Sequence, residues 1–327
     1  MKAVVLTKTC SASELTLSEV PVPSIRPGWV LVKVKAFGIN RSEIILRSSE
    51  ADAPYIKLPR IPGIECAGEI ADPSDSHFCK GQRVVALMGG MGRSFDGSYA
   101  EYTLLPVSHV FSVDTDLNWI ELAAVPETFF TAYGSLFDCL QIVSGDILLI
   151  RGGTSALGLT AVQLAKSIGC TVLATTRDKN KLNFLKEIGV DIPLLDDGTL
   201  ARQLHEIYPN GVNKVLELVG PATLQESMTF LSWHGIICST GILGKKRVLE
   251  YFDPIKMIPN GVYLTSFFSN YPTQEKIDRI FTHIRQHHLK PIIGRIFPFS
   301  RIADAHILME QNIANGKIVV YIEERQS

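Results

Sequence analysis

A glycine-rich turn near the middle of the chain constrains the fold more than any other feature. DILLIRG, from Asp146 to Gly152, is a compact apolar run typical of a buried strand, and the residues after the turn repeat apolar positions at helical spacing. Gly153, Ser155 and Gly158 take the positions of the three glycines in a G-x-G-x-x-G turn. Strand, turn and helix in this order direct free N–H groups at an anion, which predicts a phosphate-binding loop. An ordinary turn is the alternative, because a serine replaces one glycine.

The patterns on either side of this turn predict two kinds of domain. From about Asn118, compact apolar strands alternate with helical patterns, as in a doubly wound parallel sheet of the Rossmann type with right-handed crossovers. The first hundred residues instead form short alternating strands between Pro and Gly turns; in WVLVKVKAFGI, valines and lysines fall on opposite faces. A rolled, mostly antiparallel barrel is expected there.

After about Ser269 the Pro and Gly breaks of the opening region return. We therefore expect an α/β protein in which a nucleotide-binding domain, 119–268, is inserted into a barrel domain formed by 1–118 and 269–327. No internal repeat or low-complexity segment interrupts this organisation.

Composition excludes several classes of protein. Of 327 residues, 46% are hydrophobic and 20% charged, and the formal net charge is −1, so no basic excess predicts nucleic-acid binding. The start, MKAVVLTKT, lacks the long apolar core of a signal peptide, and no run is long enough for a membrane span. A cytoplasmic protein is expected. The six cysteines are scattered without a C-x-x-C pair, which predicts neither a disulfide framework nor a structural zinc lobe.

The strand after the turn indicates which dinucleotide is bound. Loops that bind NAD are usually followed, about 20 residues on, by an acid that accepts from the ribose 2′-OH. TVLATTRDKNK offers Thr176, Arg177 and Lys181 there, a hydroxyl and cations that suit a 2′-phosphate. Asp178 reads best as the N-cap of the next helix. NADPH is favoured over NADH, although Asp196, near the end of the third strand, would repel a 2′-phosphate unless its carboxylate points away.

Several motifs together resemble the medium-chain dehydrogenase/reductases, in the zinc-free quinone oxidoreductase (zeta-crystallin-like) branch, over nearly the whole chain. They are GINRSEIILR, LPRIPGIECAGEI, GSYAEY, ETFFTAYGSL, GGTSALGLTAVQLAK and ANGKIVV. The resemblance implies a GroES-like barrel, an inserted Rossmann domain, a cofactor in the cleft between them and commonly a homodimer.

The resemblance also bears on metal binding. Zinc dehydrogenases of this superfamily hold their metal with a Cys, a His of a G-H-E segment and a later Cys or Asp, and the first two positions look like Asn40 and Ile64 here. Neither side chain replaces thiolate or imidazole. A rival group, Cys66, His77 and Cys79, has acceptable ligand types but unusual spacing. No metal site is expected, and without that Lewis acid the chemistry favoured is NADPH-dependent hydride transfer to a quinone or an α,β-unsaturated carbonyl.

The resemblance implies roles for individual residues. The candidate catalytic residues are Asn40 and Arg47, beside the nicotinamide, and Tyr55, near the acceptor or simply an exposed loop aromatic. The candidate cofactor-binding residues are Asn40, Thr131, Gly153, Thr154, Ser155, Ala156, Leu157, Thr176, Arg177, Lys181, Gly241, Leu243, Phe267, Phe268 and Lys317. The two phenylalanines could equally belong to the core, and Lys317 could be merely solvated.

Two other functions fit the same sequence. An enoyl-thioester reductase would share the fold, the coenzyme and the hydride chemistry, and would need a basic rim for a CoA or carrier-protein phosphate. A non-catalytic NADPH-binding protein would explain why no acid, base or nucleophile stands out. The sequence leaves both open.

Overall fold

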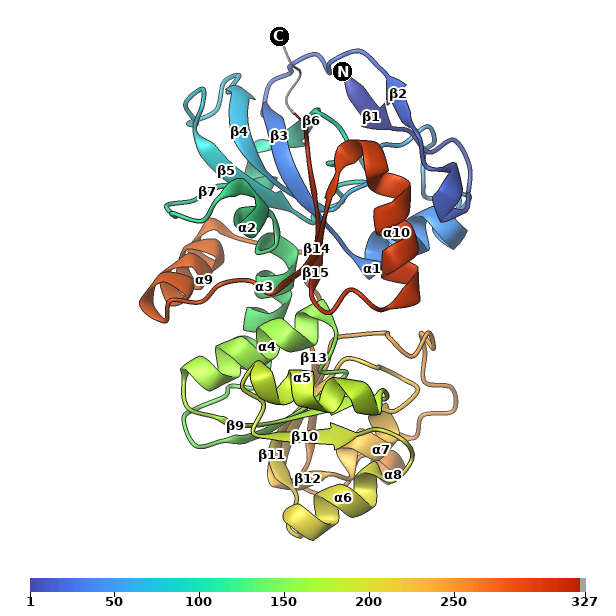
Figure 1. Cartoon of the computed structure of the whole chain (residues 1–327), viewed down its shortest axis with the longest axis vertical. Coiled ribbons are helices and arrows are strands. Elements are labelled where there is room, and N and C mark those ends of the chain that lie inside the picture. The colour runs from blue at the N-terminus through green and yellow to red at the C-terminus, as the bar shows by residue number, and fades with distance from the viewer. Residues whose placement is uncertain (324–327) are drawn as a thin grey trace. The chain divides into compact units, whose positions relative to one another are not determined.

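A computed structural model describes residues 1–323 and divides the chain into two compact units (Figure 1). Unit 1 is formed by Met1–Phe130 together with the segment that begins at Ser269, and unit 2 by Thr131–Phe268. Unit 2 is therefore an insertion into unit 1, as the change of pattern along the sequence predicts. The last four residues of the predicted barrel domain lie outside the described residues.

Unit 1 is built on a mainly antiparallel sheet with the order β14-β15-β3-β4-β5-β7, in which β6 also pairs with β3 and β14 runs parallel to β15. A separate two-stranded sheet joins β1 to β2. The strands are β1 (Lys2–Val4), β2 (Leu17–Glu19), β3 (Trp29–Ile39), β4 (Glu65–Asp72), β5 (Arg83–Leu87), β6 (Tyr102–Pro106), β7 (Val110–Ser112), β14 (Ile293–Pro298) and β15 (Lys317–Tyr321).

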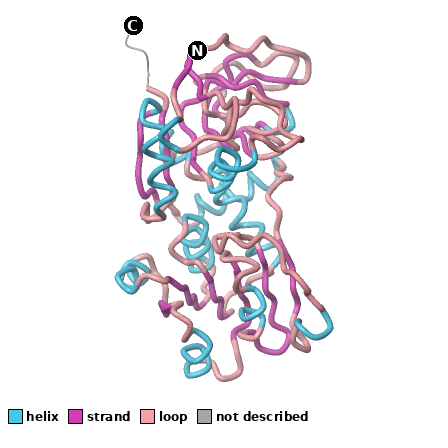
Figure 2. Tube along the Cα trace, turned by 90° about the vertical axis from the view of Figure 1, so that its right-hand side faces the viewer, coloured by secondary structure: helices cyan, strands magenta, loops and turns pink. Residues whose placement is uncertain are grey.

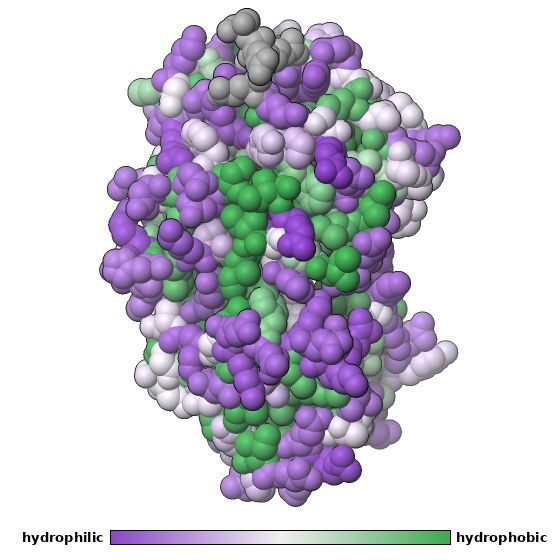
Figure 3. Space-filling model, viewed as in Figure 1, coloured by the Kyte–Doolittle hydropathy of each residue, from purple (hydrophilic) through white to green (hydrophobic). Residues whose placement is uncertain are grey.

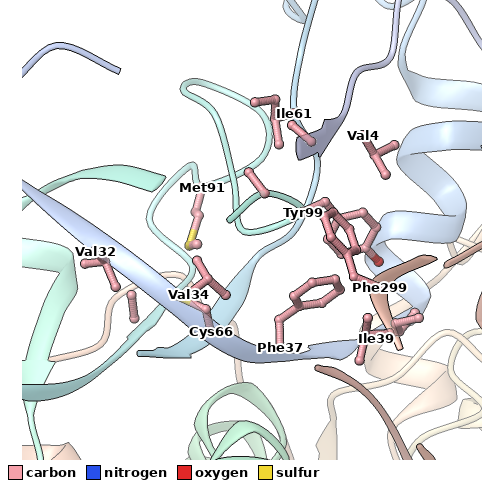
Figure 4. Packing of buried hydrophobic residues seen from close by; sticks show 14 of the residues in the cluster. Val4, Val32, Val34, Phe37, Ile39, Ile61, Cys66, Met91, Tyr99 and Phe299 are labelled. Carbon is pink, nitrogen blue, oxygen red and sulfur yellow. The ribbon is translucent and has the colours of Figure 1, made fainter. Parts of the chain in front are cut away.

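The core of unit 1 lies on one face of β3. Val30, Val32 and Val34 are buried, as the alternation with lysines predicts. Figure 4 shows aromatic residues filling the other end of this core: the ring of Phe37 stacks on Tyr99, with centroids 4.6 Å apart, and meets Phe299 edge-on at 5.7 Å. These contacts join the first strands to the last segment of the chain, so the returning segment completes the unit.

One helix of unit 1 contains the point in the sequence at which unit 2 begins. The helices of unit 1 are α1 (Arg41–Ile45), α2 (Trp119–Ala123), α3 (Pro126–Tyr133), α9 (Gln274–Gln286) and α10 (Ile302–Gln311), with the short helical turns η1 (Ala12–Glu14), η2 (Leu46–Glu50), η3 (Val107–His109) and η6 (Phe299–Arg301). Helix α2 packs against β3, β4 and β15. The division consequently falls within α3, after Phe130, rather than at the predicted position after residue 118.

Unit 2 contains a six-stranded parallel sheet with the order β10-β9-β8-β11-β12-β13, whose strands run side by side in Figure 2. The strands are β8 (Ile147–Arg151), β9 (Thr171–Thr176), β10 (Ile192–Leu195), β11 (Val212–Glu217), β12 (Leu231–Ser239) and β13 (Tyr263–Ser266). Strand order reverses between β8 and β11. This is the switch point at which doubly wound sheets bind ligands, beyond the carboxyl ends of the strands.

Helices connect the strands of unit 2. They are α4 (Ala156–Ser167), α5 (Leu182–Glu187), α6 (Leu200–Ile207), α7 (Leu224–Met228) and α8 (Pro254–Met257), with the turns η4 (Gly134–Cys139) and η5 (Lys179–Lys181). Helix α4 packs against β8 and β9, and α7 against β11 and β12. The Rossmann arrangement predicted from the alternating pattern is confirmed.

Groups of hydrophobic residues lie among larger hydrophilic areas on the face drawn in Figure 3. Within residues 1–323, no helix is long and apolar enough to cross a membrane.

Candidate functional site

The glycine turn of unit 2 lies at the switch point and is pinned to the neighbouring strand. The amides of Gly152 and Gly153 donate to the side-chain and backbone oxygens of Thr175, at 3.1 and 3.0 Å. A Cβ at Gly153 would lie 2.7 Å from the Cβ of Ala174, and one at Gly158 would lie 2.6 Å from the carbonyl oxygen of Gly152. The turn therefore has room only for glycine at these positions, as a dinucleotide loop requires.

Ser155 caps helix α4. Its hydroxyl accepts from the amide of Gly158 at 3.0 Å and donates to the carbonyl oxygen of Gly152 at 2.8 Å. The hydroxyl proton is thus used within the turn, and the predicted contact of Ser155 with a cofactor stays a prediction. The groups suited to a phosphate are the backbone amides of Ala156 and Leu157 and the adjoining Thr154. The two amides lie in the first turn of the helix, where no helical carbonyl accepts a hydrogen bond from them.

Two further predicted segments meet the glycine turn. The Leu243 side chain approaches Gly152, where an added Cβ would lie 3.1 Å from its Cδ1 atom, and its amide donates to the carbonyl of Leu218 at 3.0 Å. Gly241 passes so close to Leu218 that a Cβ there would lie 2.1 Å from the Leu218 oxygen. The loops after β8, β11 and β12 thus converge at the switch point.

Two more of the predicted cofactor-binding residues also lie in unit 2. Thr131 lies near the end of β12, and Phe267 lies beside η4. The hydroxyl of Ser135 donates to the carbonyl oxygen of Thr131 at 2.7 Å and lies 2.9 Å from the hydroxyl of Thr240, the residue before Gly241. The ring of Phe267 lies against Gly134, with no space for a Cβ between them. Its neighbour Phe268 is exposed.

The end of β9 presents a cation at the surface. Thr176 is buried, and its hydroxyl accepts from the amide of Asp178 at 3.1 Å. The Asp178 carboxylate accepts from the amide of Asn180 at 3.0 Å, so it is the N-cap that the sequence predicts. Arg177 is exposed at this strand end, and Lys181 closes the following turn.

Asp196 does not present a free carboxylate to this region. Both of its oxygens accept from Arg151, at 2.8 Å from Nε and 2.9 Å from Nη2, in a bidentate ion pair. The repulsion of a 2′-phosphate that the sequence raised is therefore countered by a buried arginine at the end of β8.

Unit 1 contains a second group of predicted residues, the buried polar network of Asn40, Glu65 and Lys317. The Lys317 ammonium lies 2.6 Å from Oε1 of Glu65 and 2.5 Å from Oδ1 of Asn40, and the Asn40 amide donates to the same Glu65 oxygen at 2.8 Å. The other Glu65 oxygen accepts from the Glu127 amide at the start of α3, at 2.8 Å. Lys317 is thus buried rather than solvated. Its predicted contact with a cofactor stays a prediction.

Glu43 and Gly38 complete the surroundings of this network and were missed from the sequence. The Glu43 carboxylate accepts from the amides of Asn40 and Ile64, at 2.9 and 3.1 Å. Burial, and next the charge of Glu65, raise the pKa of Glu43 to about 7. A Cβ at Gly38 would lie 2.4 Å from both Glu65 and Lys317. The glycine of GINRSE therefore makes room for the ion pair.

This donor set does not suit zinc. Asn40 and Ile64 supply no thiolate or imidazole, and the carboxylate that follows Ile64, Glu65, is already paired with Lys317. The rival ligands do not assemble either, because Cys66 is buried within β4 whereas Cys79 is exposed. Among residues 1–323, no three His, Cys, Asp or Glu side chains are grouped so as to hold a metal ion.

Arg47 is held inside unit 1 rather than presented to a ligand. Its guanidinium donates to the carbonyl oxygen of Cys10 at 2.5 Å, pairs with Glu310 and reaches Nδ1 of His306 at 3.4 Å. Burial, and next the charge of Arg47, lower the pKa of His306 to about 3, so the imidazole is neutral. These contacts fasten η2 to α10, which corrects the predicted catalytic role to a structural one.

Tyr55 lies on the surface of unit 1, with 68% of its area exposed. Its hydroxyl donates to Glu50 at 2.9 Å, and Glu50 is paired with Arg93 at 2.7 Å. An exposed phenol fixed by a carboxylate can exchange protons with a bound molecule and with water. Its predicted catalytic role stays a prediction.

Two family models match the chain. "Alcohol dehydrogenase GroES-like domain" matches residues 26–115 in unit 1, and "Zinc-binding dehydrogenase" matches residues 156–282. The chain is 26% identical to the human quinone oxidoreductase over 319 residues, covering 93% of this chain and 92% of that protein. It is also 26% identical to the rat synaptic vesicle membrane protein VAT-1 homolog, covering 98% of this chain and 84% of that protein.

A solved mycobacterial protein complexed with NADPH has the same fold. It superposes with a TM-score of 0.86 at 25% identity, covering 98% of this chain and 100% of that protein. The domain order, the parallel sheet and its glycine turn, and these matches agree. The chain belongs to the medium-chain dehydrogenase/reductase superfamily of oxidoreductases.

Proposed function

We propose that this protein is a zinc-independent oxidoreductase that uses NADPH to reduce a quinone or an α,β-unsaturated carbonyl. The observation that carries the proposal is the buried polar network, in which the Lys317 ammonium contacts the Glu65 carboxylate and the Asn40 side-chain oxygen. Among residues 1–323 there is no group of side chains that could bind zinc. The quinone oxidoreductases among its relatives support the acceptor class. Such acceptors are electrophilic enough to be reduced without a Lewis acid.

The residues of unit 2 fit a dinucleotide. The glycine turn lets a pyrophosphate come close to the backbone, and the amides of Ala156 and Leu157 suit the negative charge of that group. The exposed cation of Arg177 suits a 2′-phosphate. When bound, NADPH supplies the hydride. The chain must position the two molecules and provide for one proton on the reduced acceptor, and Tyr55 is the candidate for that proton.

Coenzyme binding and turnover test this proposal separately. NADPH and NADH are titrated by fluorescence and thermal shift, and NADPH oxidation is then followed with a quinone, an enone and an enoyl-CoA. Preferred NADPH binding with quinone or enone turnover is the expected result. Turnover of the thioester alone would identify an enoyl-thioester reductase, and tight binding without turnover would identify a binding protein.

We further propose that the protein forms a homodimer through the edge of the unit 2 sheet. Strand β13 is its last strand, and the large side chains of Trp233 and Tyr263 are exposed beside this edge. Unpaired strand edges invite pairing with another chain. Light scattering with size-exclusion chromatography should give twice the chain mass, and a monomer at micromolar concentration would contradict this assignment.

A further inference from the structure

The Arg151 side chain holds carboxylates on two sides at the end of β8. Its bidentate pair with Asp196 occupies Nε and Nη2, and Nη2 also lies 2.8 Å from the Glu226 carboxylate. Nη1 donates to the Ser227 hydroxyl at 3.0 Å. Only 3% of the Arg151 side chain is exposed, so the guanidinium is fixed from both sides rather than free to follow a ligand.

Asp196 lies next to the strand end at which Rossmann folds recognise the ribose. Its amide donates to the carbonyl oxygen of Thr176 at 2.8 Å, and Leu195 before it pairs in register with Thr176. In Rossmann folds that bind NAD, an acid at the end of the strand that corresponds to β9 accepts a hydrogen bond from the ribose 2′-OH. The Asp196 carboxylate is thus one strand away from the position that decides between the two coenzymes.

We propose that the Arg151–Asp196 ion pair determines coenzyme specificity by holding this carboxylate away from the 2′ position. The inference rests on the proposed use of NADPH and names the residues behind it. A released Asp196 would repel a 2′-phosphate and could accept from the 2′-OH of NADH. The pair would therefore favour NADPH without either residue contacting the phosphate.

The fork geometry of arginine is essential to this role. Two parallel N–H···O bonds fix the plane of the carboxylate as well as its position, whereas a lysine offers one point of charge. Glu226 also contacts Nη2, and Ser227 accepts from Nη1, so the guanidinium is a fixed part of unit 2. A positive charge at residue 151 without the arginine fork should consequently not be sufficient to hold the Asp196 carboxylate in place.

The test compares dissociation constants for NADPH and NADH, measured by fluorescence titration, in a set of full-length variants. Arg151→Gln should lower the preference for NADPH at least tenfold, which corresponds to about 1.4 kcal/mol. Arg151→Lys should lower it by a smaller factor, and the Arg151→Gln/Asp196→Asn double variant should restore it. Arg202→Gln, an exposed arginine of α6 paired with Glu206, is the matched control and should leave the preference unchanged.

Each result bears on one part of the argument. An unchanged preference in the Arg151 variants, or a loss that Asp196→Asn does not restore, overturns the inference while leaving NADPH use intact. A parent protein that prefers NADH overturns the proposed coenzyme itself, and the inference with it. If Arg151→Gln does not fold, Arg151→Lys with and without Asp196→Asn makes the same comparison, with the same outcomes.

Discussion

Replacing Lys317 by methionine tests the buried polar network of unit 1. The Lys317 and Glu65 side chains are 3% and 0% exposed and 2.6 Å apart, so the variant leaves a buried carboxylate without its cation. Removing one partner of a buried pair costs about 3–5 kcal/mol. At about 2–4 °C per kcal/mol for a domain of this size, the melting temperature should fall by roughly 6–20 °C.

Two companion variants separate this effect from a general loss of charge. Lys290→Met removes an exposed lysine, 79% accessible and 3.8 Å from Glu121, and should cost less than about 1 kcal/mol. Lys317→Met/Glu65→Gln removes both buried charges and should recover much of the lost stability. Urea unfolding and thermal melts measure all three. A Lys317→Met protein within about 1 kcal/mol of the parent would refute the reasoning.

Three further predictions concern single side chains. The pKa of Glu43 is raised to about 7, so the folded protein binds more protons at this group than the unfolded chain. The contribution of Glu43 to the free energy of unfolding is therefore complete below about pH 4 and falls as the pH rises toward 7. Glu43→Gln should flatten this dependence of stability on pH in urea unfolding, and an unchanged dependence would contradict the prediction. Ser155→Ala removes the cap on Gly158 and should cost about 1 kcal/mol by chemical denaturation, against no change if the cap is dispensable. Arg177→Glu should weaken NADPH binding at least about tenfold and NADH binding far less in titrations; an equal effect on both coenzymes would place the 2′-phosphate elsewhere.

The fold could be predicted because its signals are local. The strand Trp29–Ile39 and the strand Thr171–Thr176 begin and end where the alternating and apolar runs do. The helix N-cap at Asp178 also followed from residue type and position alone. Hydrophobic periodicity and capping act within a few residues, so a linear reading is enough to find them.

The contacts that the sequence did not reveal join distant parts of the chain. Lys317 reaches Asn40 across 277 residues of sequence, and Arg47 reaches His306 across 259, so neither partner was visible from spacing. The direction of the Ser155 hydroxyl depends on the turn geometry, which residue type does not fix. A signal did exist for Arg151: a charge that ends an otherwise apolar strand needs a buried partner.

Quinone reduction before and after removal of metal tests the central claim most directly. The protein is dialysed against a strong chelator, its zinc content is measured, and NADPH oxidation by a quinone is compared with the untreated protein. The account predicts the same rate in both samples, with NADPH preferred over NADH. A rate that disappears on chelation and returns with added zinc would contradict it.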